Sequence, residues 1–464
     1  MGRHASTRMR LTGNGPPGRR GVAALLGIGV VGVVALALLL SMCGGGDGTK
    51  SGTGAHAPTG KRTTAELGFG LTHTEFSADH GAAYAKKAAG ELLSQHSLPQ
   101  DQATMGWGAS NPEPSPGTYD FAELDDRVAL IRNTGGTPVI TLCCAPDWMK
   151  GGKAGQTDWS NLEAAPTPDH FDDFAALAAK VAERYPDIRH FMVWNEFKGF
   201  WHDGLKRWDY EGYTRLYNLV YQAIKKVNPD NMVGGPYVVM DSFPPGDGGN
   251  GDASASLKGD WGAADQRALD VVDYWLKHKA GADFLVLDGS STNHDDSLVP
   301  DEFAATEKFA ALSRWAAART PLPIWWAEWY VEPPASGWTE PHRTAVQASA
   351  MIQLALGGSA AAFYWNPQSR GATCPGCLWT STELSANGGR QLPMLDLLRR
   401  FAAAFPPGTA FRTVTIANDD KPNVRVLASA TAVLVVNVLG RAIHVNVDGQ
   451  SFDLAGYGIR WLQR

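Results

Sequence analysis

The stretch FMVWNE (residues 191–196) places Glu196 directly after a short apolar run, and IWWAEW (residues 324–329) places Glu328 in the same way later in the chain. An almost continuously apolar run of this length is typical of a strand that is covered on both faces, as in a parallel sheet. The two stretches therefore predict two buried parallel strands, each of which ends on a carboxylate.

Eight strand-like runs of this kind alternate with helical patterns between residues 66 and 405. The helical stretch 171–184 places Phe171, Phe174 and Val181 on one stripe, the spacing of a helix that covers a sheet. This alternation predicts an α/β fold, a (β/α)8 TIM barrel. A doubly wound sheet would have a glycine-rich phosphate turn after its first strand, and Gly68–His73 is not one. The predicted strands are 67–72, 103–107, 138–143, 190–194, 232–238, 284–287, 323–327 and 360–365.

The end of the chain has a different pattern. Apolar residues alternate with polar ones at a period of two in 443–447, and Asp448-Gly449 supplies a turn. We therefore expect a catalytic barrel over residues 66–405 and a small C-terminal all-β domain over residues 406–464. So small a β-domain should pack on the barrel, with a strand from near residue 66 as a candidate addition.

The N-terminal segment predicts a membrane anchor. A basic tail precedes an apolar heart, Val22–Leu40, of 19 residues, and a helix of that length spans about 28 Å, close to the thickness of a bilayer core. The basic flank should stay in the cytoplasm. Leu40–Cys43 is also similar to a lipoprotein cleavage box, so residues 1–43 form either a single-pass span or a lipid anchor. Residues 44–65 form a flexible Gly/Ser/Thr linker, and the barrel is expected outside the cytoplasmic membrane.

The charge balance excludes one class of partner. Lys and Arg number 41 against 47 Asp and Glu, a net charge of −6, so the chain has no basic excess for nucleic acid. Sixteen tryptophans offer rigid flat faces that suit sugar rings, although such residues also fill cores.

The two glutamates carry the chemistry. The carboxyl ends of barrel strands meet at one mouth, so Glu196 on the fourth predicted strand and Glu328 on the seventh should face each other. Two carboxyl groups about 5–5.5 Å apart are what a retaining glycosidase needs, one as nucleophile and the other as general acid and base. Either glutamate alone could be an ordinary ion-paired loop residue. Glu332 is a weaker candidate for the nucleophile, because it lies beyond the strand end.

Trp194-Asn195-Glu196 together with Glu328 resembles the clan A retaining glycoside hydrolases, and the stretch PEPSPGTYDFAELDDRVALIRNTGGTPVI (residues 112–140) resembles their second barrel unit. The barrel with its C-terminal β-domain is most similar to family thirty-nine, the β-xylosidase and exopolysaccharide hydrolase group. The resemblance implies that Glu196 is the general acid/base, that Glu328 is the nucleophile and that Asn195 holds the sugar 2-hydroxyl. It also implies hydrolysis of β-linked bonds in an oligo- or polysaccharide, without a cofactor.

Aromatic and histidine side chains near the strand ends are candidates for substrate binding. They either form a wall that stacks on sugar rings or pack the top of the barrel. The aromatic candidates are Trp107, Trp148, Tyr237, Trp329 and Trp365, and the candidates for hydrogen bonds to the substrate or to Glu328 are His73 and His294. No group of His, Asp and Glu has the spacing of metal ligands along the sequence, so no metal is predicted.

The cysteines beyond the anchor leave their pairing open. Cys374 and Cys377 flank a tight loop, and Cys143 and Cys144 are adjacent, so a disulfide is possible within each pair. Four cysteines allow three pairings. Two functional alternatives also stay open: a non-catalytic surface protein that binds glycans on a glycosidase barrel, and a metal-dependent barrel hydrolase.

Overall fold

The computed structural model describes residues 64–104, 111–247, 251–333, 336–369, 371, 374–384, 386–417 and 419–463 of the chain. The predicted anchor, residues 1–43, lies outside these residues, as does nearly all of the predicted linker, 44–65. In the part of the chain that the structure describes, no helix combines the length and the hydropathy needed to cross a bilayer.

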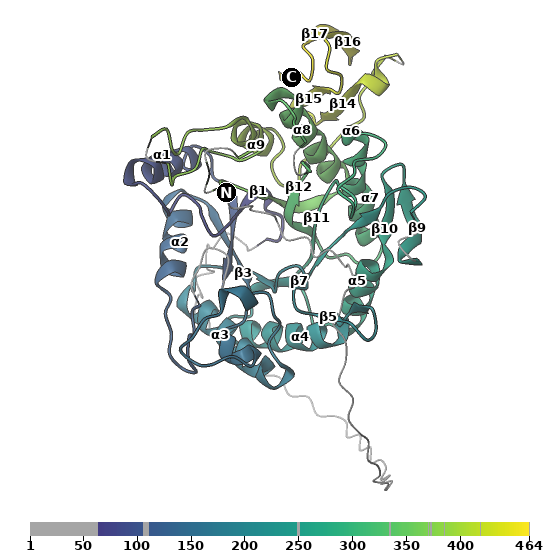
Figure 1. Ribbon diagram of the computed structural model, residues 1–464. Helices are drawn as coiled ribbons and strands as arrows, with labels where there is room; N and C mark the ends of the chain where they lie inside the picture. Colours follow the sequence, from purple (N-terminus) through teal and green to yellow (C-terminus); the bar gives the residue numbers. More distant parts are fainter. Residues whose placement is uncertain are drawn as a thin grey trace, which may run out of the picture. The chain divides into compact units, whose positions relative to one another are not determined.

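The central element is a closed barrel of eight strands (Figure 1), each hydrogen-bonded in parallel to its two neighbours. The TIM barrel prediction is confirmed. Glu196 lies three residues after the fourth barrel strand, and Glu328 lies within the seventh, two residues before its end. Around the barrel the strands are β1 (Gly68–His73), β2 (Pro99–Thr104), β3 (Thr137–Leu142), β4 (His190–Val193), β7 (Met232–Val239), β11 (Phe284–Ser290), β12 (Ile324–Tyr330) and β13 (Ser359–Tyr364).

Helices surround this barrel (Figure 1) and bury their apolar stripes against it. In α3 the stripe read from the sequence is the buried one, with Phe171, Phe174 and Val181 all inside. The α-helices are α1 (Ala83–Leu93), α2 (Ala122–Asn133), α3 (Phe171–Arg184), α4 (Tyr210–Val227), α5 (Gln266–His278), α6 (Glu302–Ala305), α7 (Glu307–Ala317), α8 (Glu340–Leu356) and α9 (Pro393–Ala404). Short strands form a hairpin, β5 (Trp201–His202) with β6 (Arg207–Trp208), and a sheet of β8 (Ser242–Phe243), β10 (Gly262–Asp265) and β9 (Ala253–Gly259).

The predicted second strand, 103–107, is wrong in its placement, because β2 begins at Pro99. Its residues Gln100, Asp101 and Gln102 are polar yet fully buried. Each has a polar partner: Gln100 bonds His73, Thr141 donates to Asp101, and Arg127 donates to Gln102. A pattern that equates buried strands with apolar residues cannot detect such a strand, because here hydrogen bonds make the burial of polar groups possible.

The amino-terminal end of the barrel is closed by the chain that enters it. Phe284 and Trp325 stack inside with ring centroids 3.7 Å apart, and the Trp325 indole donates to the carbonyl of Ala65 at 2.7 Å. The expectation that a strand near residue 66 joins the C-terminal domain is therefore wrong. Ala65 lies in the apolar cluster at this end of the barrel, and the N–H of Leu67 donates to the carbonyl of Ala360 in β13. This end is sealed, so only the carboxyl ends of the strands can form an open mouth.

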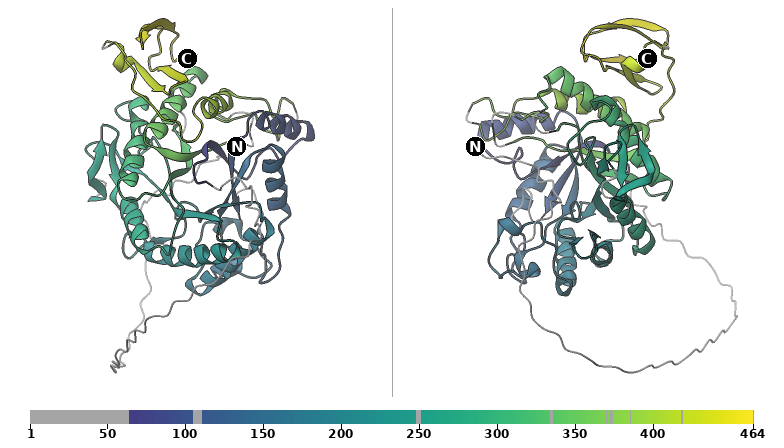
Figure 2. Two further views of the ribbon diagram at one scale, coloured as in Figure 1. Left: turned by 180° about the vertical axis from the view of Figure 1, so that it is seen from behind. Right: turned by 45° about the vertical axis from the view of Figure 1, so that its right-hand side comes forward.

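The last strands form a small β-structure beside α8, on the same side of the barrel in both views of Figure 2. A sheet of β14 (Val424–Ala428), β15 (Ala432–Asn437) and β18 (Ile459–Gln463) packs over a hairpin of β16 (Ile443–Val447) and β17 (Gln450–Leu454). Strand β15 buries both faces: Leu434 and Val436 join the core of the barrel helices, whereas Val433 and Val435 face the hairpin. The C-terminal β-structure therefore shares an apolar interface with the barrel.

Candidate active site

Glu196 sits in a tight turn just after β4. Trp194, Glu196 and Phe197 all have left-handed backbone conformations, with φ of 71°, 49° and 56°. Such conformations cost on the order of 1–3 kcal/mol each and persist only where the surroundings enforce them. Here the buried Trp194 indole donates to the carbonyl of Lys198 at 2.8 Å, and Phe197 packs 4.2 Å from the ring of Tyr213. The turn therefore fixes the direction of the Glu196 side chain, which is 24% exposed.

A bulge in β12 orients Glu328. Leu287 of β11 pairs with Trp326 and the next residue, Asp288, pairs with Glu328, so Ala327 is an extra residue in β12. The register with β13 shifts over the same stretch. A bulge of this kind turns a side chain that regular alternation would send to the other face. Glu328 is consequently 7% exposed and points toward the carboxylates of the neighbouring strands.

A second bulge brings Tyr237 to Glu328. Val286 pairs with Pro236 and Leu287 pairs with Val238, so Tyr237 is the extra residue of β7, and its φ is 56°. Its hydroxyl donates to Oε1 of Glu328 at 2.9 Å. The prediction that Tyr237 stacks on sugar is wrong, because its side chain is 1% exposed and belongs to the apolar cluster inside the barrel.

Three carboxyl groups meet at the mouth of the barrel. One oxygen each from Glu196, Asp288 and Glu328 lies within 4.8 Å of the others. The pair was expected, but Asp288 was missed. Its sequence signal was present, since Asp288 directly follows the apolar run 284–287, in the same pattern that identified both glutamates.

One ammonium group lies beside this cluster. Lys198 Nζ is 2.7 Å from Oε2 of Glu196 and 3.0 Å from Oε1 of Glu163. Burial lowers the pKa of Lys198, but the negative charges of Glu196 and Glu163 outweigh it and the pKa rises. Lys198 therefore stays charged and stabilises negative charge on Glu196.

The carboxyl groups at the mouth cannot all ionise near neutral pH. Burial, followed by the charge of Glu196, raises the pKa of Glu328 to about 8, although Lys198 and the Tyr237 hydroxyl act in the opposite direction. Burial and the charges of Glu196 and Glu328 raise the pKa of Asp288 well above its ordinary value. Protonating one member of such a group lowers the cost of ionising the next.

The three carboxylates are also, among the described residues, the one group of acidic, His and Cys side chains with the spacing of metal ligands. No such spacing is visible along the sequence, because the members of the group come from three strands far apart in the chain. Glu196 and Glu328 already have protein partners, Lys198 and Tyr237, that a cation would have to displace.

Two of the predicted binding residues have structural roles instead. His73 is fully buried, with Nδ1 bonded to Ser77 and Nε2 to Gln100, so neither ring nitrogen is free for a substrate. Burial lowers the pKa of His73 to about 3, which keeps the ring neutral. Trp329 is fully buried on the outer face of β12, with its ring 4.9 Å from that of Tyr364 and in the core beneath the helices. Both predictions are corrected.

The remaining candidates lie near the strand ends and have contacts of their own. The Trp148 indole donates to the carbonyl of Glu113 at 2.9 Å, and His294 lies 3.6 Å from Asp247. Trp365 follows β13 at the mouth end, and its buried Nε1 has no hydrogen-bond partner among the described residues. The amide Nδ2 of Asn195, next to Glu196, is likewise buried without a partner. Trp107 lies outside the described residues.

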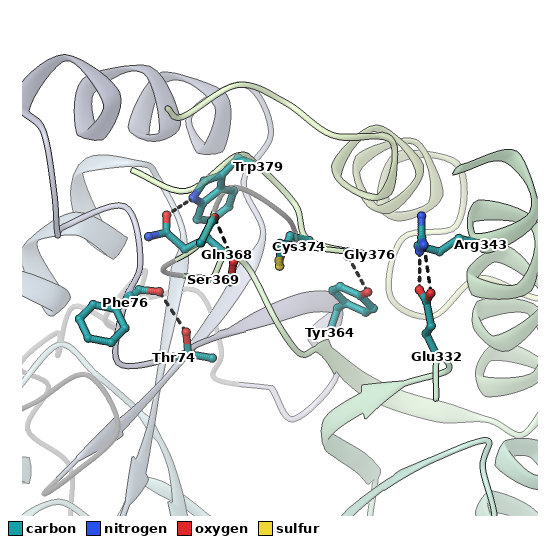
Figure 3. Close-up of a disulfide and its surroundings, with 12 residues drawn as sticks. Thr74, Phe76, Glu332, Arg343, Tyr364, Gln368, Ser369, Cys374, Gly376 and Trp379 are labelled. Carbon is teal, nitrogen blue, oxygen red and sulfur yellow. Dashed lines mark hydrogen bonds and ion pairs between the residues drawn. A yellow bond between two sulfur atoms is a disulfide. The ribbon is translucent and has the colours of Figure 1, made fainter. Parts of the chain in front are cut away.

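Glu332 is excluded as the nucleophile by its contacts. Arg343 of α8 forms an ion pair with both of its carboxylate oxygens, as Figure 3 shows. Figure 3 also shows the loop after β13, where the Tyr364 hydroxyl donates to the carbonyl of Gly376 at 2.6 Å. The structure joins Cys374 to Cys377, and Cys143 to Cys144, by disulfides.

An eight-stranded parallel barrel with two glutamates at the mouth, after its fourth strand and on its seventh, defines a barrel of the glycosidase class. The sequence model described as "Glycosyl hydrolases family 39" matches residues 74–360, more than half of the chain. The chain therefore belongs to glycoside hydrolase family 39, and it is a glycoside hydrolase.

Solved structures have the same fold at low sequence identity. A monomeric beta-xylosidase from Caulobacter crescentus is 17% identical, with a TM-score of 0.51, over 81% of this chain and 74% of that one. A family 39 glycoside hydrolase from Bacteroides cellulosilyticus is 16% identical, with a TM-score of 0.52, over 86% and 79%. A conserved exported protein from Bacteroides fragilis is 12% identical, with a TM-score of 0.55, over 87% and 99%. No curated protein sequence matches the chain.

Proposed function

We propose that this glycoside hydrolase is a retaining enzyme that cleaves β-linked glycosidic bonds by double displacement, with Glu328 as nucleophile and Glu196 as general acid/base. The observation that carries the proposal is the approach of the two carboxyl groups, with oxygens within 4.8 Å of each other. Retaining enzymes hold the pair about 5–5.5 Å apart, whereas inverting enzymes need about 6.5–9.5 Å to admit a water between them.

In the first step a carboxylate oxygen of Glu328 attacks the anomeric carbon. The bond from that carbon to the leaving oxygen breaks, Glu196 gives its proton to the leaving oxygen, and a glycosyl ester of Glu328 forms. In the second step Glu196 takes a proton from water, and the resulting hydroxide attacks the anomeric carbon. Glu328 leaves as a carboxylate, and two inversions give net retention.

The charges at the mouth support this division of roles. Because the charge of Glu196 is the second-largest contribution to the raised pKa of Glu328, a proton on Glu196 allows Glu328 to ionise. The Tyr237 hydroxyl then donates to the Glu328 carboxylate and stabilises its charge. The first step therefore needs an ionised Glu328 and a proton that Glu196 can pass to the leaving oxygen.

One buried donor without a partner supports a sugar as the ligand. Asn195 Nδ2 belongs to the residue next to Glu196, and the family resemblance assigns to it the hydrogen bond to the sugar 2-hydroxyl. A buried donor without a partner costs roughly 1–3 kcal/mol, and a substrate hydroxyl would remove that cost on binding.

The substrate class in this proposal is a β-xyloside or a related β-linked chain of an exopolysaccharide or cell-surface glycan. The relative from Caulobacter crescentus is described as a beta-xylosidase, which supports the first choice. The predicted anchor in residues 1–43 supports a location on the outer side of the cell membrane, where such glycans lie.

The proposal is tested with a panel of aryl β-glycosides on the full-length protein, with detection of the released phenol. Turnover of an aryl xyloside or another β-glycoside, with a product that NMR shows to have kept the β-configuration at first release, supports the proposal. Binding of glycans without turnover of any sugar would instead favour a glycan-binding protein on a glycosidase barrel. Release of an inverted product would contradict the roles of the two glutamates.

A further inference from the structure

The third carboxyl group, Asp288, has no part in the double displacement described above. It lies near the end of β11, the sixth barrel strand, and pairs in register with Glu328 across the strands. Its residue exposure is 1%, and its oxygen Oδ1 has no hydrogen-bond partner among the described residues. An ionised carboxylate so placed would lack most of the hydrogen bonds that normally stabilise it.

The contact of Asp288 with Glu196 requires a proton. Oxygens of the two side chains lie within 4.8 Å of each other, and after burial the charge of Glu196 is the largest cause that disfavours ionisation of Asp288. Two carboxyl groups so close, one of them fully buried, do not both ionise near neutral pH, so the pair holds one proton. The other charged groups that act on Asp288 are Glu328, which disfavours its ionisation, and Lys198, which favours it. Burial, followed by the charges of Glu328 and Asp288, raises the pKa of Tyr237. Tyr237 therefore keeps its proton, and its hydroxyl donates to Glu328.

The ion pair of Lys198 decides where the negative charge of this carboxyl pair lies in the free enzyme. Lys198 Nζ is 2.7 Å from Glu196, so the charge is stabilised on Glu196 and the proton on the buried Asp288. This state is unsuited to a general acid that acts alone, because Glu196 would have no proton to give when the substrate arrives.

We propose that Asp288 is the proton store for Glu196: the two carboxyl groups share one proton, which reaches the leaving oxygen through Glu196. This inference rests on the proposed function. As Glu328 forms its ester bond, the Asp288 proton moves to one oxygen of Glu196, and Glu196 releases a proton to the leaving oxygen. Asp288 and Glu196 end as carboxylates, and Glu328 ends as a neutral ester. The water that hydrolyses the ester returns the proton to the pair.

The number of negative charges at the site favours transfer of the Asp288 proton as the Glu328 ester forms. Two negative charges are present before the step, on Glu328 and on the Glu196–Asp288 pair, and two are present after it. The charge of Glu328 is one of the causes that disfavour ionisation of Asp288, and that charge disappears when the ester forms. Release of the stored proton is thereby coupled to attack by the nucleophile.

The test is Asp288→Asn in the full-length protein, assayed on two aryl glycosides of one sugar across a pH range. Asparagine keeps the size of the side chain and can still donate a hydrogen bond to Glu196, but it can neither store nor release the proton. We expect kcat/KM for a phenyl glycoside, which needs an acid, to fall at least about tenfold, and its alkaline limb to move about one pH unit lower. A dinitrophenyl glycoside, whose leaving group needs no proton, should change less than about threefold in the first step.

Controls separate this role from a structural one. Asp101→Asn removes another fully buried aspartate, whose carboxylate accepts a hydrogen bond from Thr141. Because the charge of Asp101 adds to the raised pKa of Glu328, this variant should move the acid limb to lower pH and leave the alkaline limb in place. Asp288→Ser, which also lacks an acidic proton, covers the case in which Asp288→Asn does not fold. Equal losses on both substrates with an unmoved alkaline limb would overturn the proposal. Absence of turnover by the unaltered enzyme would instead count against the proposed function.

Discussion

The ends of β4 and β12 present the same residue, a glutamate after an apolar strand, in two different surroundings. Glu196 is 24% exposed on a left-handed turn and is paired with the ammonium of Lys198. Glu328 is 7% exposed on a bulge and accepts a hydrogen bond from the neutral hydroxyl of Tyr237. An exposed group beside a proton store can exchange protons, whereas a buried, fixed carboxylate is suited to attack carbon. In the proposed mechanism these surroundings, rather than the residue type, decide which glutamate is the nucleophile and which is the acid/base.

The largest loss of activity is expected from replacing Glu328, the more buried of the two glutamates. Glu328→Ala should lower kcat on every β-glycoside by on the order of 10⁴-fold or more, because no other carboxylate can form the ester. Added azide can enter the space that the side chain leaves, so activity on an activated aryl glycoside should partly return. NMR of the product should show a glycosyl azide of inverted configuration. A glycosyl azide of retained configuration would indicate instead that Glu328 is the acid/base and Glu196 the nucleophile.

The loss of activity on replacing Glu196, the more exposed glutamate, should depend on the leaving group. Glu196→Ala should cost about 10²–10⁴-fold on a phenyl glycoside but much less on a dinitrophenyl glycoside, whose departure needs no proton. The slopes of log kcat/KM against leaving-group acidity, measured for the variant and the unaltered enzyme, check this. Parallel slopes would show that Glu196 is not the acid.

The Tyr237 hydroxyl, which donates a hydrogen bond to Glu328, can be removed without changing either glutamate. Tyr237→Phe deletes the donor to Glu328 and should lower kcat/KM by about tenfold, the value of one hydrogen bond to a charged group. Because this bond lowers the pKa of Glu328, its loss raises that pKa, and the acid limb of the pH profile should move to higher pH. The alkaline limb should stay in place. Movement of the alkaline limb alone would link Tyr237 to Glu196 instead.

Lys198→Met tests the corresponding partner at the exposed end. Lys198 stabilises the charged form of Glu196, so without it the acid keeps its proton to higher pH. The alkaline limb measured with a phenyl glycoside should therefore move upward, by about one pH unit or less, since the group is partly open to solvent. Lys198→Arg, which keeps the charge, is the matched control and should move the limb less. An alkaline limb that stays in place or moves downward would mean that Lys198 does not stabilise the charged form of Glu196.

The comparison of Glu196 with Glu328 also shows which features of the fold and site could be predicted from the sequence. Both glutamates were found because each follows an apolar strand, and the periodicity of such strands with helices predicted the barrel. The directions of the side chains could not be found, because Glu328 depends on an extra residue, Ala327, that becomes visible only in the register with neighbouring strands. His73 and Trp329 were misassigned because position near a strand end does not show which face a side chain occupies. Strand β2 was misplaced because its buried residues are polar.

The smallest expected effect is that of removing divalent cations. The three carboxyl groups have the spacing of metal ligands. A cation between Glu196 and Glu328 would neutralise both carboxylates, and their surroundings would then be alike. The ammonium of Lys198 already lies 2.7 Å from Glu196 and would repel such an ion. Dialysis against a chelator should therefore leave kcat and KM unchanged within about twofold, because the double displacement uses only carboxyl groups and water. Loss of activity that returns on adding a divalent cation would favour a metal-dependent hydrolase, and the roles assigned to Lys198 and Tyr237 would then be wrong.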